Sequence, residues 1–449
     1  MTTKRLVSTL AALSLLLVPT LAHAQQASTL PGLLLDQFLQ NIVLARTPGG
    51  EGIAAHTATF TTDDTTTAVT ALVQQVGQQI ASQLSTTPLG SSSAGFTYRY
   101  DAALGTFTRS TSTFGPAFAE RADTAGKGKV SFGVNYQHAG YSSLDGRTLD
   151  SGDIKFFLPH QKGATISFVQ GDMIEAQALL KLSSDTAMVF ASYGVTDALD
   201  LGVAVPFQHV RLELTYHATI LDFATHAVAP DTHLFLNGQK TADFTSSGSA
   251  SGIGDMIIRA KYTFLKQPSA GLAIGMDLHL PTGDQANLLG AGGTQTAIYL
   301  IASSTRGKLA PHVNVGFTAS SHVGLRTPQQ TLDAGVSDQL NYVGGVEYAA
   351  SPRLTIIGDL IGRTFTSTLR LERAPQTHTF QQGPTAPVET TTLDALAMAP
   401  GSVTSVLAAA GLKFNVSRNL LVSAHVISSV NGAGLRRSVS PVLGFDFSF

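Results

Sequence analysis

The chain ends in VSPVLGFDFSF, residues 439–449, in which almost every second residue is apolar. Successive side chains of a strand point to opposite faces, so one face carries an apolar row that ends at the aromatic Phe449. The other face carries Ser440, Gly444, Asp446 and Ser448. This pattern is typical of the closing strand of an outer-membrane barrel, which presents a terminal Phe to the barrel-assembly machinery. The alternative is a strand of a secreted β-sandwich, a fold that seldom repeats the alternation as often as this chain does.

The same alternation recurs upstream, from Lys129 onward. Residues 272–280 place apolar side chains at every second position and small or polar side chains between them. The pattern returns in segments 256–264, 313–317, 406–414 and 420–426. Such segments are strands with two chemically distinct faces. Three corners share an aromatic residue, a polar tight turn and a Leu that resumes the alternation, at 193–201, 348–356 and 414–422. Turns of this kind join antiparallel neighbours.

Short turns alternate with long polar connections, as they do in bacterial barrels whose short turns face the periplasm. We therefore expect an all-β fold, a transmembrane antiparallel barrel of about twelve strands (within a range of about ten to fourteen), with a partly helical N-terminal segment. The expected strands cover 129–143, 173–194, 199–221, 254–265, 270–281, 294–303, 308–320, 338–349, 353–366, 404–416, 419–430 and 437–449. The expected long connections cover 144–172, 222–253, 282–293, 321–337, 367–403 and 431–436.

Two expected strands, 173–194 and 199–221, are longer than the roughly 9–11 residues that cross a bilayer. We expect them to project beyond the membrane as an extracellular hairpin. Pro206 and a change in the parity of the apolar residues near 208–210 predict a bulge in the second strand.

Composition supports a lipid-facing exterior. Only 13% of the residues are charged, whereas 43% are hydrophobic, and the formal net charge is −2. A Lys or Arg that faces lipid at mid-bilayer costs about 2–4 kcal/mol, so an apolar exterior explains the shortage of ions. The small net charge gives no electrostatic footprint for nucleic acid. The absence of Cys excludes a disulfide scaffold, a thiolate zinc site and an iron–sulfur cluster.

Three segments are expected along the chain. Lys4 and Arg5 precede an apolar run, and Ala22-His23-Ala24 follows it as a signal-peptidase pattern, so residues 1–24 are predicted to be a removed secretory signal. Residues 25–127 contain an apolar stripe at helical spacing, from Val69 to Leu84, and a hairpin pattern at 95–109. They are predicted to form a periplasmic or plug-like segment. Residues 128–449 are predicted to form a barrel in the cell outer membrane, reached by secretion through the inner membrane.

Several motifs within about 95–449 point to a known family. They are FGPAFAERA at 114–122, GVTDALDLGVAVP at 194–206, GIGD at 252–255, LPTGD at 280–284, LLG at 288–290 and PHVNVGF at 311–317. Together they resemble the outer-membrane transporter-like β-barrel family grouped with the meta-pathway phenol-degradation proteins, and more distantly the long-chain fatty-acid outer-membrane channels. The resemblance implies a barrel that passes small hydrophobic molecules. The N-terminal third shares no motif with the fatty-acid channels, so the resemblance does not extend their hatch mechanism to this chain.

A barrel of about twelve strands has a narrow lumen. The inward positions carry both signs of charge, at Asp255, Arg259, Lys261, Asp277, His279, His312, Glu347, Asp359, Arg363, Lys413 and His425. These side chains either cross-link the lumen through ion pairs or line a ligand-selective pathway. We predict passive uptake or export of small hydrophobic or aromatic compounds, with outer-membrane lipids as the surroundings. The alternative is a structural or adhesive barrel with a closed lumen that acts through extracellular loops such as 367–403.

An enzyme is not expected. The sequence lacks a Gly-x-Ser-x-Gly elbow, a phosphate-binding loop, a dinucleotide fingerprint and a His-Glu-x-x-His helix, so no catalytic residue and no cofactor is predicted. An outer-membrane lipid hydrolase is a less favoured alternative, because it needs His and Ser together on an outward face and no pair stands out. No metal site is predicted either. The irregular spacing of His209, His217, His226 and His233 favours solvated or strand-face histidines over metal ligands.

Overall fold

The computed structural model describes residues 29–33, 44, 72, 75–77, 79–84, 98–101, 106–109, 111–160, 171–223, 233–321, 325–326, 331–332, 336–383, 385–417 and 419–449. The predicted signal segment, 1–24, lies outside the described residues. No helix within these ranges is long and apolar enough to cross a membrane.

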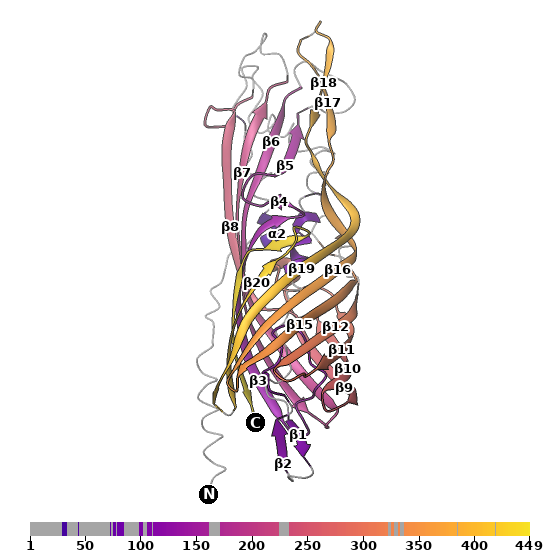
Figure 1. The fold of residues 1–449 in the computed structure, drawn as a ribbon. Coiled ribbons are helices and arrows are strands. Elements are labelled where there is room, and N and C mark those ends of the chain that lie inside the picture. Colours follow the sequence, from indigo (N-terminus) through magenta and orange to yellow (C-terminus); the bar gives the residue numbers. More distant parts are fainter. Residues whose placement is uncertain are drawn as a thin grey trace.

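Twelve strands form one closed antiparallel barrel, which confirms the predicted fold (Figure 1). The strands are β3 (Val130–Leu144), β6 (Met173–Gly194), β7 (Leu199–Leu221), β9 (Met256–Lys266), β10 (Ala270–Leu280), β11 (Gln295–Ser304), β12 (Leu309–Ser320), β15 (Gln339–Ser351), β16 (Leu354–Arg373), β19 (Leu396–Ser417), β20 (Leu420–Ser429) and β22 (Ser440–Ser448). Closure occurs at β3, which pairs with β22 on one side and with β6 on the other. The last strand of the chain therefore completes the cylinder, as its alternation predicts.

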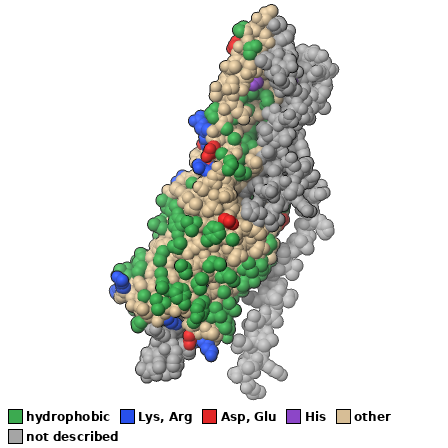
Figure 2. All heavy atoms as spheres, turned by 90° about the vertical axis from the view of Figure 1, so that its right-hand side faces the viewer, with side chains coloured by type: hydrophobic (Ala, Val, Ile, Leu, Met, Phe, Trp, Pro, Cys, Tyr) green, Lys and Arg blue, Asp and Glu red, His purple; other side chains and the backbone are tan. Residues whose placement is uncertain are grey.

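The outer surface of the barrel is apolar. Along β22 buried and exposed residues alternate without a break, and the exposed positions carry Leu443, Phe445 and Phe447. Figure 2 shows hydrophobic side chains over the lower part of the molecule. Charged side chains lie at the edges of this hydrophobic surface and in the part of the molecule above it. A closed barrel satisfies its backbone hydrogen bonds internally, and an apolar band then lets it cross lipid. This architecture confirms the expected outer-membrane barrel.

The two ends of the barrel differ. Short turns join β6 to β7, β9 to β10, β11 to β12 and β15 to β16 at the end where the C-terminus also lies (Figure 1). Because short turns of such barrels face the periplasm, we assign this end to the periplasm and the opposite end to the cell exterior.

At the extracellular end, several strands extend well above the rest of the barrel (Figure 1). The projection of β6 and β7 confirms the predicted long hairpin, and β5 (Ile154–Pro159) and β8 (Thr241–Ile253) flank it. Three predicted connections contain strands here, and the first of them is segment 144–172, which contains β5. Segment 222–253 contains β8, and segment 367–403 contains the ends of β16 and β19 and the hairpin of β17 (Gln376–Gln381) and β18 (Val388–Leu393). The last two stretches are rich in Ser, Thr and Gly, so their strands lack the apolar alternation of the membrane band.

The predicted bulge near 208–210 is wrong for the pairing of β6 with β7. Their register is unbroken over the whole of β7. The irregularity lies on the other side of β7, where β8 ends and β9 begins. Three residues there, 254–256, lie opposite only two residues of β7, 205 and 206. The change of apolar parity has another cause. Outward residues are apolar up to Phe207, and above that level the inward residues Val210, Leu212 and Leu214 are the buried ones.

The N-terminal segment supplies part of the extracellular core. Helix α2 (Leu30–Leu33) contributes Leu30 and Leu33 to one large buried cluster with β6 and β7, and the helical residues 75–77 and 79–84 add Val76, Ile80 and Leu84 to it. This arrangement matches the predicted stripe, of which Val69 and Val73 lie outside the described residues. The predicted hairpin is confirmed as β1 (Tyr98–Asp101) and β2 (Thr106–Arg109), at the periplasmic end (Figure 1).

Four short strands and one 3-10 turn complete the described elements. They are β4 (Arg147–Thr148), β13 (Leu325–Arg326), β14 (Thr331–Leu332), β21 (Leu435–Arg437) and η1 (Gln285–Asn287).

Candidate functional site

Residues 111–126, here called the plug segment, lie inside the barrel near its periplasmic end. The segment forms no strand or helix, and inward side chains of the barrel accept hydrogen bonds from its backbone. The Phe114 amide donates to Thr355 Oγ1 at 3.1 Å, and the Gly115 amide donates to Glu347 Oε2 at 3.1 Å. Further along, the amides of Ala117 and Phe118 both donate to Asp359 Oδ2, at 3.2 and 3.0 Å. The barrel wall thus replaces the backbone partners that regular structure would supply.

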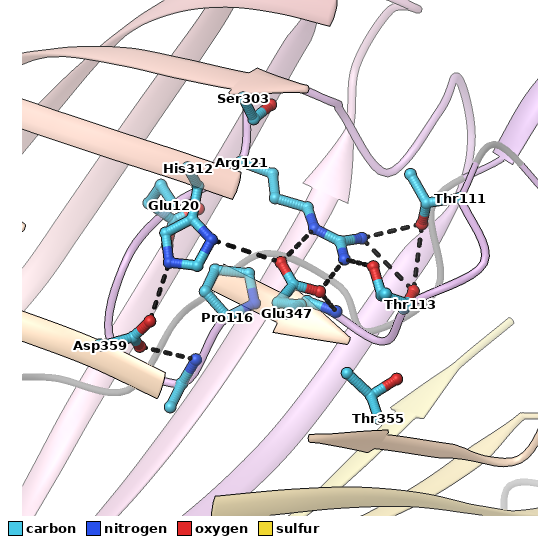
Figure 3. Close-up of polar contacts among 12 residues, drawn as sticks. Thr111, Thr113, Pro116, Glu120, Arg121, Ser303, His312, Glu347, Thr355 and Asp359 are labelled. Carbon is cyan, nitrogen blue, oxygen red and sulfur yellow. Dashed lines mark hydrogen bonds and ion pairs between the residues drawn. The ribbon is translucent and has the colours of Figure 1, made fainter. Parts of the chain in front are cut away.

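A buried ion pair fixes the middle of the plug segment (Figure 3). Arg121 Nε donates to Glu347 Oε1 at 3.0 Å, and Nη2 of the same guanidinium contacts the second carboxylate oxygen. The side chains are 2% and 0% exposed. Thr111 Oγ1 accepts a hydrogen bond from Arg121 Nη1 at 2.9 Å, and Thr113 also contacts the guanidinium. Such a bidentate pair imposes one geometry on both partners.

His312 joins two plug contacts into one network (Figure 3). Its Nε2 lies 2.8 Å from Asp359 Oδ1, and its Nδ1 lies 3.6 Å from Glu347 Oε1. All three side chains are fully buried. The imidazole therefore connects the two carboxylates that hold the plug segment.

A second charged group holds the next stretch of the plug segment. The Glu120 carboxylate pairs with Arg259 at 2.6 Å and with Lys261 at 3.4 Å, and Arg259 also pairs with Asp277 at 2.6 Å. Asn314 Oδ1 accepts from the Glu120 amide at 2.6 Å, and Asn314 Nδ2 donates to the Glu120 carbonyl at 3.0 Å. The opposite wall contributes Lys413, whose Nζ donates to the Pro116 carbonyl at 2.9 Å.

A cavity of about 190 Å³ lies in the lumen between the plug segment and the extracellular loop 282–291. Its wall is mixed. Apolar side chains include Phe118, Met188, Ile257, Leu289 and Val442, while Arg259, Asp277 and Tyr299 form a polar cluster among the lining residues. Within that cluster the Tyr299 hydroxyl donates to Asp277 Oδ1 at 3.1 Å, and the Arg259 guanidinium lies 6.0 Å from the centre of the Tyr299 ring.

Asp255 fastens loop 282–291, whose Leu289 lines the cavity. Its carboxylate accepts from the Gly283 amide at 3.0 Å and from the Ala291 amide at 2.7 Å. The loop closes tightly on itself, because a Cβ at Gly283 would lie 2.3 Å from the Leu289 carbonyl oxygen. Two of the motifs quoted from the sequence, at 280–284 and 288–290, thus build one wall of the cavity.

The structure directs all eleven predicted lumen residues inward and divides them between two regions. Glu347, Asp359, Lys261 and Lys413 contact the plug segment, and His312 links two of them. The cavity wall includes Asp255, Arg259, Asp277, His279 and Arg363. His425 lies edge-on to Phe118, with ring centres 6.2 Å apart.

The sequence interpretation missed the partners on the plug side, Glu120 and Arg121, and the neutral wall residues Asn314 and Thr355. Asn314 and Thr355 occupy inward positions of predicted strands, so parity alone points to them. Glu120 and Arg121 belong to a quoted motif, but the sequence gives no sign that they meet residues more than a hundred positions away.

The four histidines considered as metal ligands do not converge. His209 and His217 point outward from β7, His233 is buried against Asp172 at 2.7 Å, and His226 lies outside the described residues. In the described parts of the chain no group of three or more His, Asp or Glu residues could hold a metal ion.

One His–Ser pair does lie on the outer face, above the apolar band. His209 Nδ1 and Ser251 Oγ are 2.5 Å apart. On β6 the residue paired with His209 is Asp185, whose carboxylate bonds to Tyr136, His138 and Arg211. No hydrogen bond between Asp185 and His209 accompanies these contacts, so the described residues contain no aligned Ser–His–acid triad here.

Comparisons with known proteins find one matching family model and several solved structures of similar barrels. No curated protein matches the chain. Among solved structures, the COG4313 outer membrane channel from Pseudomonas putida F1 is 13% identical, with 73% of this chain and 98% of that chain covered and a TM-score of 0.44. The NanC porin is 8% identical (70% and 98% covered, TM-score 0.34), and the Ralstonia pickettii toluene transporter TbuX is 11% identical (72% and 90% covered, TM-score 0.26). Residues 174–321 match the model of a family described as "Putative MetA-pathway of phenol degradation", which confirms over those residues the resemblance that the motifs indicated.

Proposed function

We propose that this protein is a passive channel of the outer membrane for small hydrophobic or aromatic compounds. The observation that carries the proposal is the cavity inside the lumen. Its volume of about 190 Å³ exceeds the roughly 150 Å³ of an apolar protein cavity that accommodates benzene. A solute with one ring therefore fits. Movement is downhill, driven by the concentration gradient of the solute.

The lumen residues take two roles in this proposal. Glu347, Asp359, Lys261 and Lys413 hold the plug segment across the periplasmic exit, while Asp255, Arg259, Asp277, His279 and Arg363 shape the solute cavity. His312 positions Glu347 and Asp359, and His425 positions Phe118, which lines the cavity. Passage then requires the plug segment to shift, and its many wall contacts make that step slower than entry into the cavity.

The proposal includes the expected segments of the chain. Residues 1–24 act as a removed secretory signal, 25–127 form a segment that reaches into the barrel, and 128–449 form the barrel itself. The barrel-assembly machinery recognises the last strand through Phe449. Transport, rather than catalysis, is the role that a cavity inside the lumen supports.

A flux assay with a filled cavity tests the proposal. Ala297 on β11 lines the cavity, and Ala302 on the same strand points outward. Ala297→Phe adds a ring where the solute would sit, so flux of a one-ring solute into proteoliposomes should fall at least about tenfold, because overfilled cavities reject ligands. Ala302→Phe adds the same ring to the lipid face and should leave flux unchanged. Equal flux in both variants, or no flux through the unmodified protein, would refute the proposal.

The closed-lumen alternative has one observation in its favour. The β17–β18 hairpin extends beyond the rest of the extracellular end and could meet a partner (Figure 1). Removal of residues 376–393 separates the two functions, since loop-dependent binding would be lost while flux through the cavity would persist.

A further inference from the structure

A row of cations follows the periplasmic edge of the barrel. The short turns β9–β10, β11–β12 and β15–β16 come in succession around this edge, because β10 pairs with β11 and β12 pairs with β15. These turns carry Lys266, Arg306, Lys308 and Arg353, here called the basic rim, and their sequences, KQPSA, STRGKL and SPRL, include no Asp or Glu. Arg306, Lys308 and Arg353 are exposed, and Lys266 is half-buried. Successive turns are two strands apart, so the cations repeat about every 10 Å along the edge.

The basic rim differs from the charged surface at the other end of the molecule. Exposed cations of the extracellular strands have carboxylate partners, in the pairs Lys181–Glu213, Arg211–Asp185 and Arg373–Asp394. No residue of the basic rim takes part in an ion pair within the described parts of the chain. Lys266 Nζ donates to the carbonyl of Asp197 at 3.4 Å and lines a small pocket with Asp123 of the plug segment, so the nearby acidic residues lie at one end of the row. The other three cations present their charge to the surroundings.

The basic rim lies at the foot of the apolar band. Each turn is flanked by an exposed apolar residue of the outer face, Phe264, Leu309 or Ile356. Phe264 stands two residues before Lys266, and Leu309 directly follows Lys308. At about 3.3 Å per residue, the cations therefore lie within about 10 Å of side chains that contact lipid. Figure 2 shows Lys and Arg side chains at the lower edge of the hydrophobic surface. This depth corresponds to the headgroup layer, which extends about 5–8 Å beyond the hydrocarbon core.

An anion that is anchored in the membrane fits this position better than a dissolved anion. The chain as a whole carries a formal net charge of −2, so attraction of anions is local to the basic rim. A dissolved anion meets the cations through water and salt, which screen exposed charges over about 8–10 Å. A phospholipid is already held beside the basic rim by its acyl chains, which pack on the apolar band. Contact between its headgroup and the cations therefore costs little further loss of freedom.

We propose that the basic rim binds the phosphate headgroups of anionic phospholipids in the periplasmic leaflet of the outer membrane. Lys and Arg donate charge-assisted hydrogen bonds to phosphate oxygens, and the guanidinium of Arg donates two in parallel. The basic rim thus gathers anionic lipids along the β9–β16 side of the barrel and opposes vertical displacement of this side in the membrane. The inference goes beyond the proposed channel function and does not depend on it, since it concerns the outer surface and no residue of the lumen.

A tryptophan probe measures which lipids lie beside the basic rim, since the chain contains no Trp of its own. In L309W the indole replaces an exposed side chain next to Lys308. The vesicles contain equal amounts of phosphatidylglycerol and phosphatidylethanolamine, and one or the other lipid carries brominated chains that quench the indole. Quenching should show at least about a threefold preference for phosphatidylglycerol, and the preference should fall in about 0.5 M salt.

Two charge variants and a second probe complete the test. R306Q/K308Q/R353Q in the L309W background should abolish the preference. K181Q/R211Q/R373Q removes the same number of charges from the extracellular strands and should leave the preference unchanged. Leu340→Trp, at the extracellular end of β15, places the indole on the same wall but away from the basic rim, and it should show no preference.

Equal quenching by the two lipids in L309W overturns the inference. A preference that survives R306Q/K308Q/R353Q, in protein of normal heat-modifiable gel mobility, does so as well. Inorganic phosphate, added at equal ionic strength, should leave the preference unchanged, and its loss would assign the basic rim to a dissolved anion instead. Flux of a one-ring solute into vesicles of phosphatidylcholine tests the proposed function independently of all these outcomes.

Discussion

At the scale of single residues, the Arg121–Glu347 pair is the buried ion pair that joins the plug segment to the wall strand β15. Both side chains are buried, and the same carboxylate also accepts from the Gly115 amide. A buried pair adds little net stability compared with apolar packing, but the loss of one partner leaves an uncompensated charge. The pair therefore specifies where the plug segment sits more than it stabilises the barrel.

Glu347→Ala should release the plug segment. It leaves the Arg121 guanidinium buried without its carboxylate, which costs about 3–5 kcal/mol locally. We expect faster hydrogen exchange at the Phe114 and Gly115 amides and a higher ion conductance in planar bilayers. Glu213→Ala is the matched control, because its pair with Lys181 is exposed and contributes at most about 1 kcal/mol. Unchanged exchange in the Glu347 variant would show that the pair does not hold the plug segment.

Parity along the strands was enough to predict that Glu347 and Asp359 point inward. It was not enough to predict their partners. The plug segment has no periodic pattern, and Arg121 meets a carboxylate 226 residues further along the chain. Contacts of that range depend on closure of the whole barrel, which local sequence does not encode.

At the scale of elements, β7 shows how one strand serves two surroundings. Its pairing with β6 keeps the same residues inward throughout, yet the apolar residues change sides near Phe207. Below this level the outward side meets lipid, and above it the inward side meets the N-terminal helical residues. The change in the parity of the apolar residues near 208–210 is therefore caused by the change from lipid to the extracellular core, and not by a bulge.

Val203→Arg on β7 should destabilise the barrel by about 2–4 kcal/mol, because the outward side chain faces lipid within the apolar band. Thr215→Arg lies on the same outward side but above the band, where the side chain meets water. It should change stability by less than about 0.5 kcal/mol. The midpoints of urea unfolding in lipid vesicles compare the two. Equal losses would place the boundary of the membrane elsewhere on β7.

The surroundings of each strand determine whether its sequence pattern predicts it. The membrane-crossing strands were found because lipid demands apolar residues at every second position. β8 was missed because its outward side meets water, so Thr, Ser and Gly alternate with other small residues and no apolar row marks it.

At the scale of the whole molecule, three layers follow one another along the barrel axis. An apolar core above the membrane includes the N-terminal helical residues, the cavity lies below it, and the plug segment lies toward the periplasm. Under the proposed function, a solute that reaches the cavity is retained until the plug segment moves. The plug segment then controls solute passage.

A reversible lock on the plug segment tests this claim most directly. A Cβ at Gly271 on β10 would lie 3.0 Å from the Ala122 Cβ, somewhat closer than the roughly 3.5–4.5 Å of disulfides, so a shift of about 0.5 Å in the plug segment lets the bond form. The chain contains no Cys that could interfere. In proteoliposomes, A122C/G271C should show at least about tenfold lower flux of a one-ring solute when oxidised, and a reductant should restore the flux of the unmodified protein. Equal flux in the oxidised and reduced states would contradict the account.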